Sequence, residues 1–294
     1  MNGGAGLKAT AALAWLAALL MAGCLGGHPV EMFHRAGPSS TPGSLAVRAD
    51  LPSGRLEVSA GSAEALYDLS LSYCRDHFRP LTRFQEDAGR SGLPGAGLLE
   101  VAALSGRGDR REEAGEEPNL MTLLLRPGVP LDLRLSVGRG SMDLDLTALG
   151  IARLAVHGGS GPAAVKFQAG NSRDLEQFRF VAGEGPVRLE GLGWGRVTSL
   201  EFHGGAGEAA IDWTGPGPAE AAAFLDPGTG PLSLSFPADL GVVLTGKGLR
   251  HGTGFDGFVE QGGVWVSENQ RKTARRLTLV LDPGAGEIRF AWKP

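Results

Sequence analysis

A pair of glycines separated by one residue recurs along the chain and constrains the fold more than any other feature. The Gly-x-Gly pair stands at residues 138–140, 159–161, 183–185, 205–207, 228–230 and 284–286. The first five copies are 21, 24, 22 and 23 residues apart. Glycine makes up 47 of the 294 residues without a Gly-X-Y triplet period, which excludes collagen. We therefore expect many tight turns between short strands.

Apolar residues keep the same phase around each glycine pair. In the third copy, Phe178 and Phe180 precede the pair and Leu189 follows it, while Glu190 and its counterparts are mostly polar or small. Gly191 is the one departure from the apolar pattern. A period of two on both sides of a turn predicts a strand, a glycine turn and a second strand. We expect one or both glycines of the turn to adopt positive φ.

Two architectures fit a strand–turn–strand unit of about 22 residues. In a stacked β-solenoid each unit is one coil, and in a meander each unit is a hairpin of a barrel or propeller. Propeller blades need about twice this length. Similar apolar residues recur at the same position relative to each glycine pair. This favours stacking, because each such position then forms a continuous buried ladder along the stack. The sequence predicts an all-β, β-helix-like solenoid with Leu189 facing inward and Asp145 facing outward.

The start of the chain has the shape of a bacterial export signal. An apolar run, too short to span a bilayer comfortably, follows Lys8 and ends at Cys24. Small residues precede the cysteine, which resembles the lipobox, where the cysteine is diacylated and becomes the mature N-terminus; Met21 replaces the usual Leu. We expect a signal peptide over residues 1–23 and lipid (palmitate) on Cys24, with an ordinary cleaved signal as the alternative. Lipidation leaves Cys74 without a disulfide partner.

Composition divides the remaining chain into four parts. The expected parts are a lipidated, flexible Gly/Pro/Ser-rich tether over 24–44, an N-terminal β module over 45–103, a polar loop and connector over 104–127, and the main solenoid with its C-terminal cap over 128–294. Within the last part, Gly262 and Gly263 indicate a hairpin that helps to close the open end of the stack.

Several segments resemble the bacterial toast-rack family. The resemblance rests on residues 130–138, 141–149 and 279–288, and on residues 54–63 for its N-terminal module. The family is related to the LiaF-like C-terminal domain, also called the cell wall-active antibiotics response domain. The resemblance implies a β-solenoid in the cell envelope, often lipid-anchored. Its motifs are structural and name no catalytic residue.

Two patterns associated with chemistry are incomplete. His157 and His203 occupy equivalent turn positions, but another coil lies between them, so about 10 Å separates their backbones and no further ligands are evident. Residues 241–247 have Walker A spacing, but Gly248 stands where Ser or Thr must bind Mg²⁺. We predict no metal and no cofactor.

Charged residues recur at one outward phase of the repeat. Asp145, Lys166, Glu190 and Asp212 form this row. Paired carboxylates could catalyse sugar cleavage if their environments pushed their pKa values apart. Because Lys166 lies between the first two acids, the row is better read as a charge-compensated, solvated face.

The prediction for function is a non-catalytic, lipid-anchored envelope protein whose β-stack is an interaction, scaffold or stress-sensing surface. The alternative is a glycan-active β-helix enzyme, a polysaccharide lyase or hydrolase. Expected partners are the membrane, through lipid, and an envelope protein or cell-wall polymer; no small-molecule substrate is identified. A net charge of −4 argues against a nucleic-acid binder. Leu25 after the cysteine points to the outer membrane, facing the periplasm, in a Gram-negative host.

Overall fold

The computed structural model describes residues 29–40, 42–87, 95–105, 119–246, 255–282, 284 and 286–294, and these residues form strands joined by turns. The strands are β1 (Val30–Ala36), β2 (Ser44–Ala60), β3 (Tyr67–Cys74), β4 (Phe78–Asp87), β5 (Ala96–Ser105), β6 (Leu120–Leu125), β7 (Pro130–Asp145), β8 (Gly150–His157), β9 (Ala163–Lys166), β10 (Gln177–Val181), β11 (Val187–Glu190), β12 (Ser199–His203), β13 (Ala209–Asp212), β14 (Glu220–Asp226), β15 (Leu232–Pro237), β16 (Leu240–Thr245), β17 (Phe258–Gln261), β18 (Val264–Ser267), β19 (Arg275–Leu281) and β20 (Ile288–Lys293). Within this part of the chain, no helix is long and apolar enough to cross a membrane. The predicted signal peptide and Cys24 lie outside the described residues.

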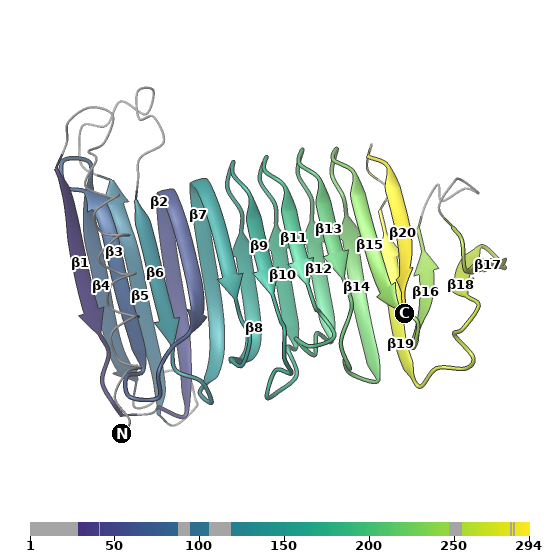
Figure 1. Ribbon diagram of the computed structural model, residues 1–294, viewed down its shortest axis with the longest axis horizontal. Helices are drawn as coiled ribbons and strands as arrows, with labels where there is room; N and C mark the ends of the chain where they lie inside the picture. Colours follow the sequence, from purple (N-terminus) through teal and green to yellow (C-terminus); the bar gives the residue numbers. More distant parts are fainter. Residues whose placement is uncertain are drawn as a thin grey trace, which may run out of the picture.

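Two rows of strands run along the long axis of the molecule (Figure 1). The first sheet has the order β4–β5–β2–β7–β8–β10–β12–β14–β19–β16–β18–β17. The second sheet has the order β1–β3–β6–β2–β7–β9–β11–β13–β15–β20. The long strands β2 and β7 belong to both sheets. They change sheet at Gly54 and Gly140, which are register partners with φ of 123° and 124°.

Successive coils stack in parallel register, with one side chain of each coil in the same ladder. In the first sheet the partners are Leu154, Phe178, Leu200, Ala223 and Leu279. In the second sheet they are Val165, Leu189, Ile211, Leu234 and Phe290. All except the partly buried Phe290 are buried in one continuous core. The predicted all-β stacked solenoid and its inward phases are confirmed.

The repeated glycines are required for a different reason from the one predicted. Of the twelve glycines in the six pairs, only Gly140 and Gly228 have positive φ. Instead, a Cβ on Gly183 would collide with the carbonyl oxygen of Gly159 one coil earlier, and a Cβ on Gly205 would collide with that of Gly183. The second glycines stack in the same way, as Gly161 does on Gly140 with an N–H···O distance of 3.0 Å. The prediction of positive φ was therefore wrong at most of these turns, where close backbone stacking excludes any side chain.

The C-terminal end of the stack is closed by strands that are out of chain order. β19 lies between β14 and β16 and is parallel to both. β18 and β17 then extend the first sheet as an antiparallel hairpin beyond β16. Its turn contains Gly262 and Gly263, with φ of 62° and 82°, as the sequence predicted.

Aromatic side chains fill the space between the two sheets at this end. The rings of Phe255 and Trp265 are 4.5 Å apart, and those of Phe258 and Phe290 are 5.4 Å apart. Trp292 donates its indole N–H to the carbonyl of Asp256 at 3.0 Å. The contacts join β17 and β18 to β20, so the hairpin helps to close the end of the core.

Two boundaries of the expected organisation were wrong. Val30–Ala36, expected within the flexible tether, forms β1, which is antiparallel to β3 along its whole length. Leu120–Leu125, expected within the connector, forms β6, which lies between β3 and β2. Both strands are held by backbone pairing at the N-terminal end, where the stack changes from parallel to antiparallel.

Candidate interaction surface

The outer face of the second sheet contains a groove of about 610 Å³. It crosses β11, β13 and β15 and reaches Lys293 of β20. Short side chains form its floor, among them Ala210, Ser233 and Ser235, because the outward positions of these strands alternate with the buried ladder. Longer charged side chains stand around them. The groove therefore offers a flat, rigid bottom with charged margins.

The charges of the groove are only partly paired. The Asp212 carboxylate lies 3.2 Å from Nζ of Lys293 and accepts the Thr214 hydroxyl at 2.7 Å. Arg188 and Glu190 line the same groove on β11, and their side chains form no hydrogen bond or ion pair with any described residue. The charged groups of Arg188 and Glu190 are thus open to a partner.

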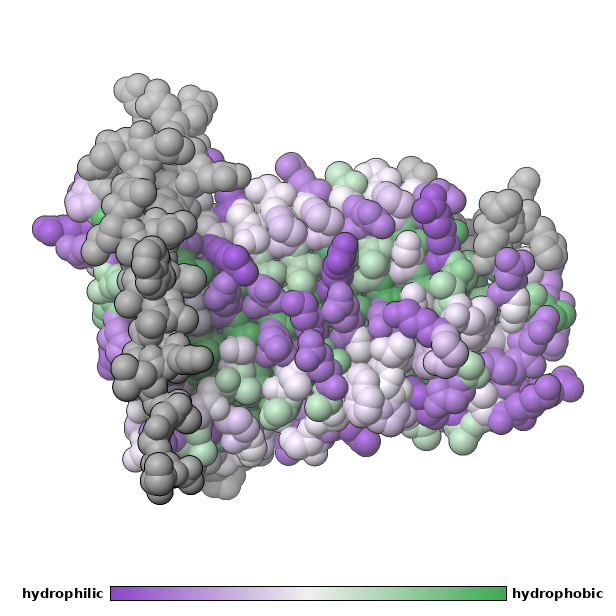
Figure 2. Space-filling model, in the orientation of Figure 1, coloured by the Kyte–Doolittle hydropathy of each residue, from purple (hydrophilic) through white to green (hydrophobic). Residues whose placement is uncertain are grey.

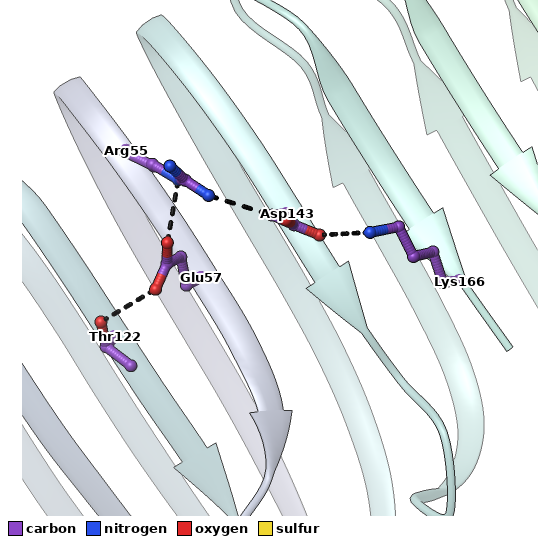
Figure 3. A network of polar contacts seen from close by, with 5 residues as sticks. All are labelled: Arg55, Glu57, Thr122, Asp143 and Lys166. Atoms are coloured by element: carbon purple, nitrogen blue, oxygen red, sulfur yellow. Dashed lines mark hydrogen bonds and ion pairs between the residues drawn. The ribbon is translucent and has the colours of Figure 1, made fainter. Parts of the chain in front are cut away.

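Towards the N-terminal end, the same outer face carries a network of polar contacts across four strands (Figure 3). Arg55 contacts Glu57 at 2.9 Å and Asp143 at 3.7 Å. Lys166 approaches the other oxygen of Asp143 at 3.4 Å, and Thr122 donates to Glu57. Cations and carboxylates alternate along this chain of contacts. Such partly exposed pairs add little stability each, and they neutralise the surface.

The predicted row of charged residues is present in the structure, but its ion pairs differ from those expected. Asp145, Lys166 and Glu190 are successive register partners, as the repeat required. Lys166, however, contacts Asp143 rather than the acids of its own row. Asp145 instead accepts the backbone N–H of Thr147 at 3.2 Å. Lys166 and Asp212 are therefore compensated by residues outside the row, whereas Asp145 and Glu190 have no ion pair with a described residue, so the row is charge-compensated only in part.

The two turn histidines lie in one ladder with Val181 between them. Nε2 of His203 is 2.8 Å from Glu201, and Nδ1 is 3.7 Å from Asp226. The hydrogen bond with His203 lowers the pKa of the Glu201 carboxyl, and Arg179 lowers it further. Among the described residues, no group of three or more His, Cys, Asp or Glu side chains is placed to hold a metal ion.

A second, smaller depression of about 350 Å³ lies on the outer face of the first sheet. Arg48 and Arg134 are direct register partners there, on β2 and β7, and His157 lies beside them. Arg48 contacts Glu100 at 3.3 Å. Nothing in the repeat pattern pointed to this depression, because its residues come from β2, β4, β5, β7 and β8.

The remaining sequence candidates have structural roles. The segment with Walker A spacing begins in β16, a largely buried strand, rather than in a phosphate-binding loop. Cys74 is 1% exposed. Asn171 is a buried polar side chain that the sequence analysis missed. It bonds both backbone groups of Ile151 and the carbonyl of Gly195, and so ties its own loop to β8 and to the turn that contains Gly195.

Residues 38–183, from just before β2 to the end of β10, match the N-terminal domain of toast_rack, DUF2154. The chain belongs to the toast-rack family. A comparison with curated proteins found no relative.

Two solved structures are similar to this toast-rack protein. A candidate cell adhesion protein from Clostridium sporogenes is 14% identical, with 90% of this chain and 100% of that chain covered and a TM-score of 0.45. A candidate adhesin from Bacteroides fragilis is 10% identical, with 90% and 97% covered and a TM-score of 0.38.

The visible face of this toast-rack protein carries apolar surface between hydrophilic side chains along its long axis (Figure 2). A surface of mixed character on a rigid sheet is suited to contact with a large partner.

Proposed function

We propose that this toast-rack protein is a non-enzymatic component of the bacterial envelope, anchored by lipid on Cys24, whose outer faces bind another envelope component. The observation that carries the proposal is the groove on the second sheet, where Arg188 and Glu190 stand unpaired beside a floor of short side chains. A partner with charges of both signs, such as an envelope protein or a cell-wall polymer, would satisfy them.

Binding explains the arrangement of the carboxylates better than catalysis does. General acid–base chemistry on a sugar needs two acids whose environments hold them in different protonation states. Here Asp143 lies between two cations, and Asp212 is held by Lys293 and Thr214. Both acids are thus engaged by cations or hydroxyls of the same face, an arrangement that suits a recognition surface.

Reversal of one unpaired charge tests the interaction surface. We expect Arg188→Glu to lose the main partner captured by the anchored protein after cross-linking in cells, identified by mass spectrometry. Arg276→Glu makes the same charge change on the exposed face of β19 in the first sheet and should retain that partner. A captured histidine kinase would indicate stress sensing, and peptidoglycan or its enzymes would indicate a role in the wall.

Two results would contradict this proposal. Equal capture by the two variants would show that the groove is not the binding surface. Release of reducing ends or unsaturated sugars from peptidoglycan or acidic polysaccharides, lost on substitution of Asp143, Asp145, Glu190 or Asp212, would establish the enzyme instead.

The anchor is tested by Cys24→Ser. We expect this variant to lose palmitate labelling and to leave the membrane fraction, because two acyl chains on the cysteine hold a protein firmly where one chain does not. The β-stack should remain folded, since Cys24 precedes every described strand. If the variant stays with membranes after a high-salt wash, lipid is not the anchor.

A further inference from the structure

The distance between the proposed anchor and the first strand is short. Only residues 25–29 separate Cys24 from Val30, the first residue of β1. The carbonyl of Pro29 already accepts the backbone N–H of Arg75 at 3.3 Å. Five extended residues span at most about 18 Å. Lipid on Cys24 would therefore keep this part of the stack close to the bilayer, and a long, loose tether is not available.

The chain enters the fold at a corner that we call the entry corner: the start of β1, the turn 75–77 between β3 and β4, and the paired ends of β4 and β5. Val30 pairs with Cys74 just before the turn, and Arg79 pairs with Leu104 just after it. The corner lies at the end of the long axis opposite β17 (Figure 1).

Large apolar side chains are exposed at this corner. Met32 on β1 is 77% exposed, and Leu104 on β5 is 49% exposed, more than any other large hydrophobic residue that the structure describes. They belong to the outer faces of different sheets. Met32 pairs with Ser72, just before the turn 75–77, and Leu104 pairs with Arg79, just after it. A single exposed apolar residue is common on a protein surface, but here the two most exposed ones both lie at the end of the stack where the chain enters from the proposed anchor.

The charges of the corner are balanced. Arg75 is paired with Glu31 at 3.0 Å. Arg79 is exposed and has no ion pair with another described residue, and Asp76 is the second acid. Two cations and two anions are compatible with a zwitterionic headgroup region and give no strong attraction to anionic lipid. Burial of apolar side chains would therefore drive the contact, and salt should not disrupt it.

We propose that the entry corner rests in the headgroup region of a phospholipid bilayer, with Met32 and Leu104 immersed and the long axis of the stack directed away from the membrane. The inference rests on the proposed lipid anchor. In the second sheet, nine strand spacings separate β1 from β20, and six strand spacings separate β1 from β11. At about 4.8 Å per spacing, the groove would stand about 29 to 43 Å from the bilayer.

The test uses the full, acylated protein in phosphatidylethanolamine-rich vesicles, with a nitroxide spin label on Met32→Cys or Leu104→Cys. Val259→Cys on β17, at the opposite end and 46% exposed, is the matched control. Buried Cys74 should not react. We expect both corner labels to collide several-fold less often than the control with a water-soluble nickel complex, and more often with membrane-dissolved oxygen. The difference should persist at high salt.

The experiment distinguishes a missing contact between the entry corner and the bilayer from missing lipid on Cys24. Mass spectrometry of Cys24 and flotation of the vesicles report the anchor directly. If the protein is acylated and floats, but the corner labels meet nickel as often as the control does, the corner contact is refuted and the anchor stands. If Cys24 carries no lipid and the protein does not float, both proposals fail.

Discussion

Alanine in place of Gly183 is expected to lower the free energy of unfolding by about 3 kcal/mol, since overpacking against rigid surroundings costs this order of energy. The added methyl group would overlap the carbonyl oxygen of Gly159, and backbone cannot rotate away as a long side chain can. Gly205 stacks on Gly183 in turn, so any shift is passed to the next coil. Chemical denaturation of the purified protein measures the change.

Gly170→Ala is the matched control for this prediction. A Cβ at Gly170 meets nothing within 4 Å, and its φ is not positive. The same substitution should change stability by less than about 0.5 kcal/mol, or stabilise slightly by restricting the unfolded chain. Equal losses at the two sites would show that glycine is needed for chain flexibility in general and not for stacking.

Aspartate in place of Leu189 is expected to have a still larger effect. Leu189 is 0% exposed and lies in the ladder between Val165 and Ile211. An unpaired carboxylate there would be buried with no cation in the ladder, so we expect a loss of more than about 4 kcal/mol or failure to fold. Thermal and denaturant unfolding, followed by far-UV circular dichroism, measures this change.

Arg188→Asp introduces the same residue one position earlier on the same strand. Because Arg188 faces outward, its loss should cost less than about 1 kcal/mol, the range of strand propensities. Similar destabilisation by both variants would mean that the inward and outward phases of β11 are assigned incorrectly.

The repeat was predictable because it obeys a local rule. Alternation around each glycine pair placed Leu189 inward and Asp145 outward, and the structure agrees. β1 was missed because an edge strand is held through backbone hydrogen bonds, and its sequence, with Met32 and His34 exposed, carries little alternation. β6 was missed because it precedes the first glycine pair and belongs to no repeated unit.

The candidate surface was predictable only in part. The repeat fixes which residues face outward, and it placed Glu190 and Asp212 on one face. It does not say how far a long side chain reaches, so the pairing of Lys166 with Asp143 required coordinates. The groove depends on short side chains from β13 and β15 lying together, with Lys293 contributed by β20.

The position of β19 also restricts how the molecule can be assembled during synthesis. A solenoid whose coils follow chain order can grow vectorially, each new coil docking on the previous one as it leaves the ribosome or the translocation channel. Here β16 is attached to the rest of the first sheet only by pairing with β19, which is synthesised after it. The hairpin β17–β18 depends on β16 in the same way. The unit of β16, β17 and β18 must therefore wait, unattached to the stack, until residues 275–294, which contain β19 and β20, have been delivered.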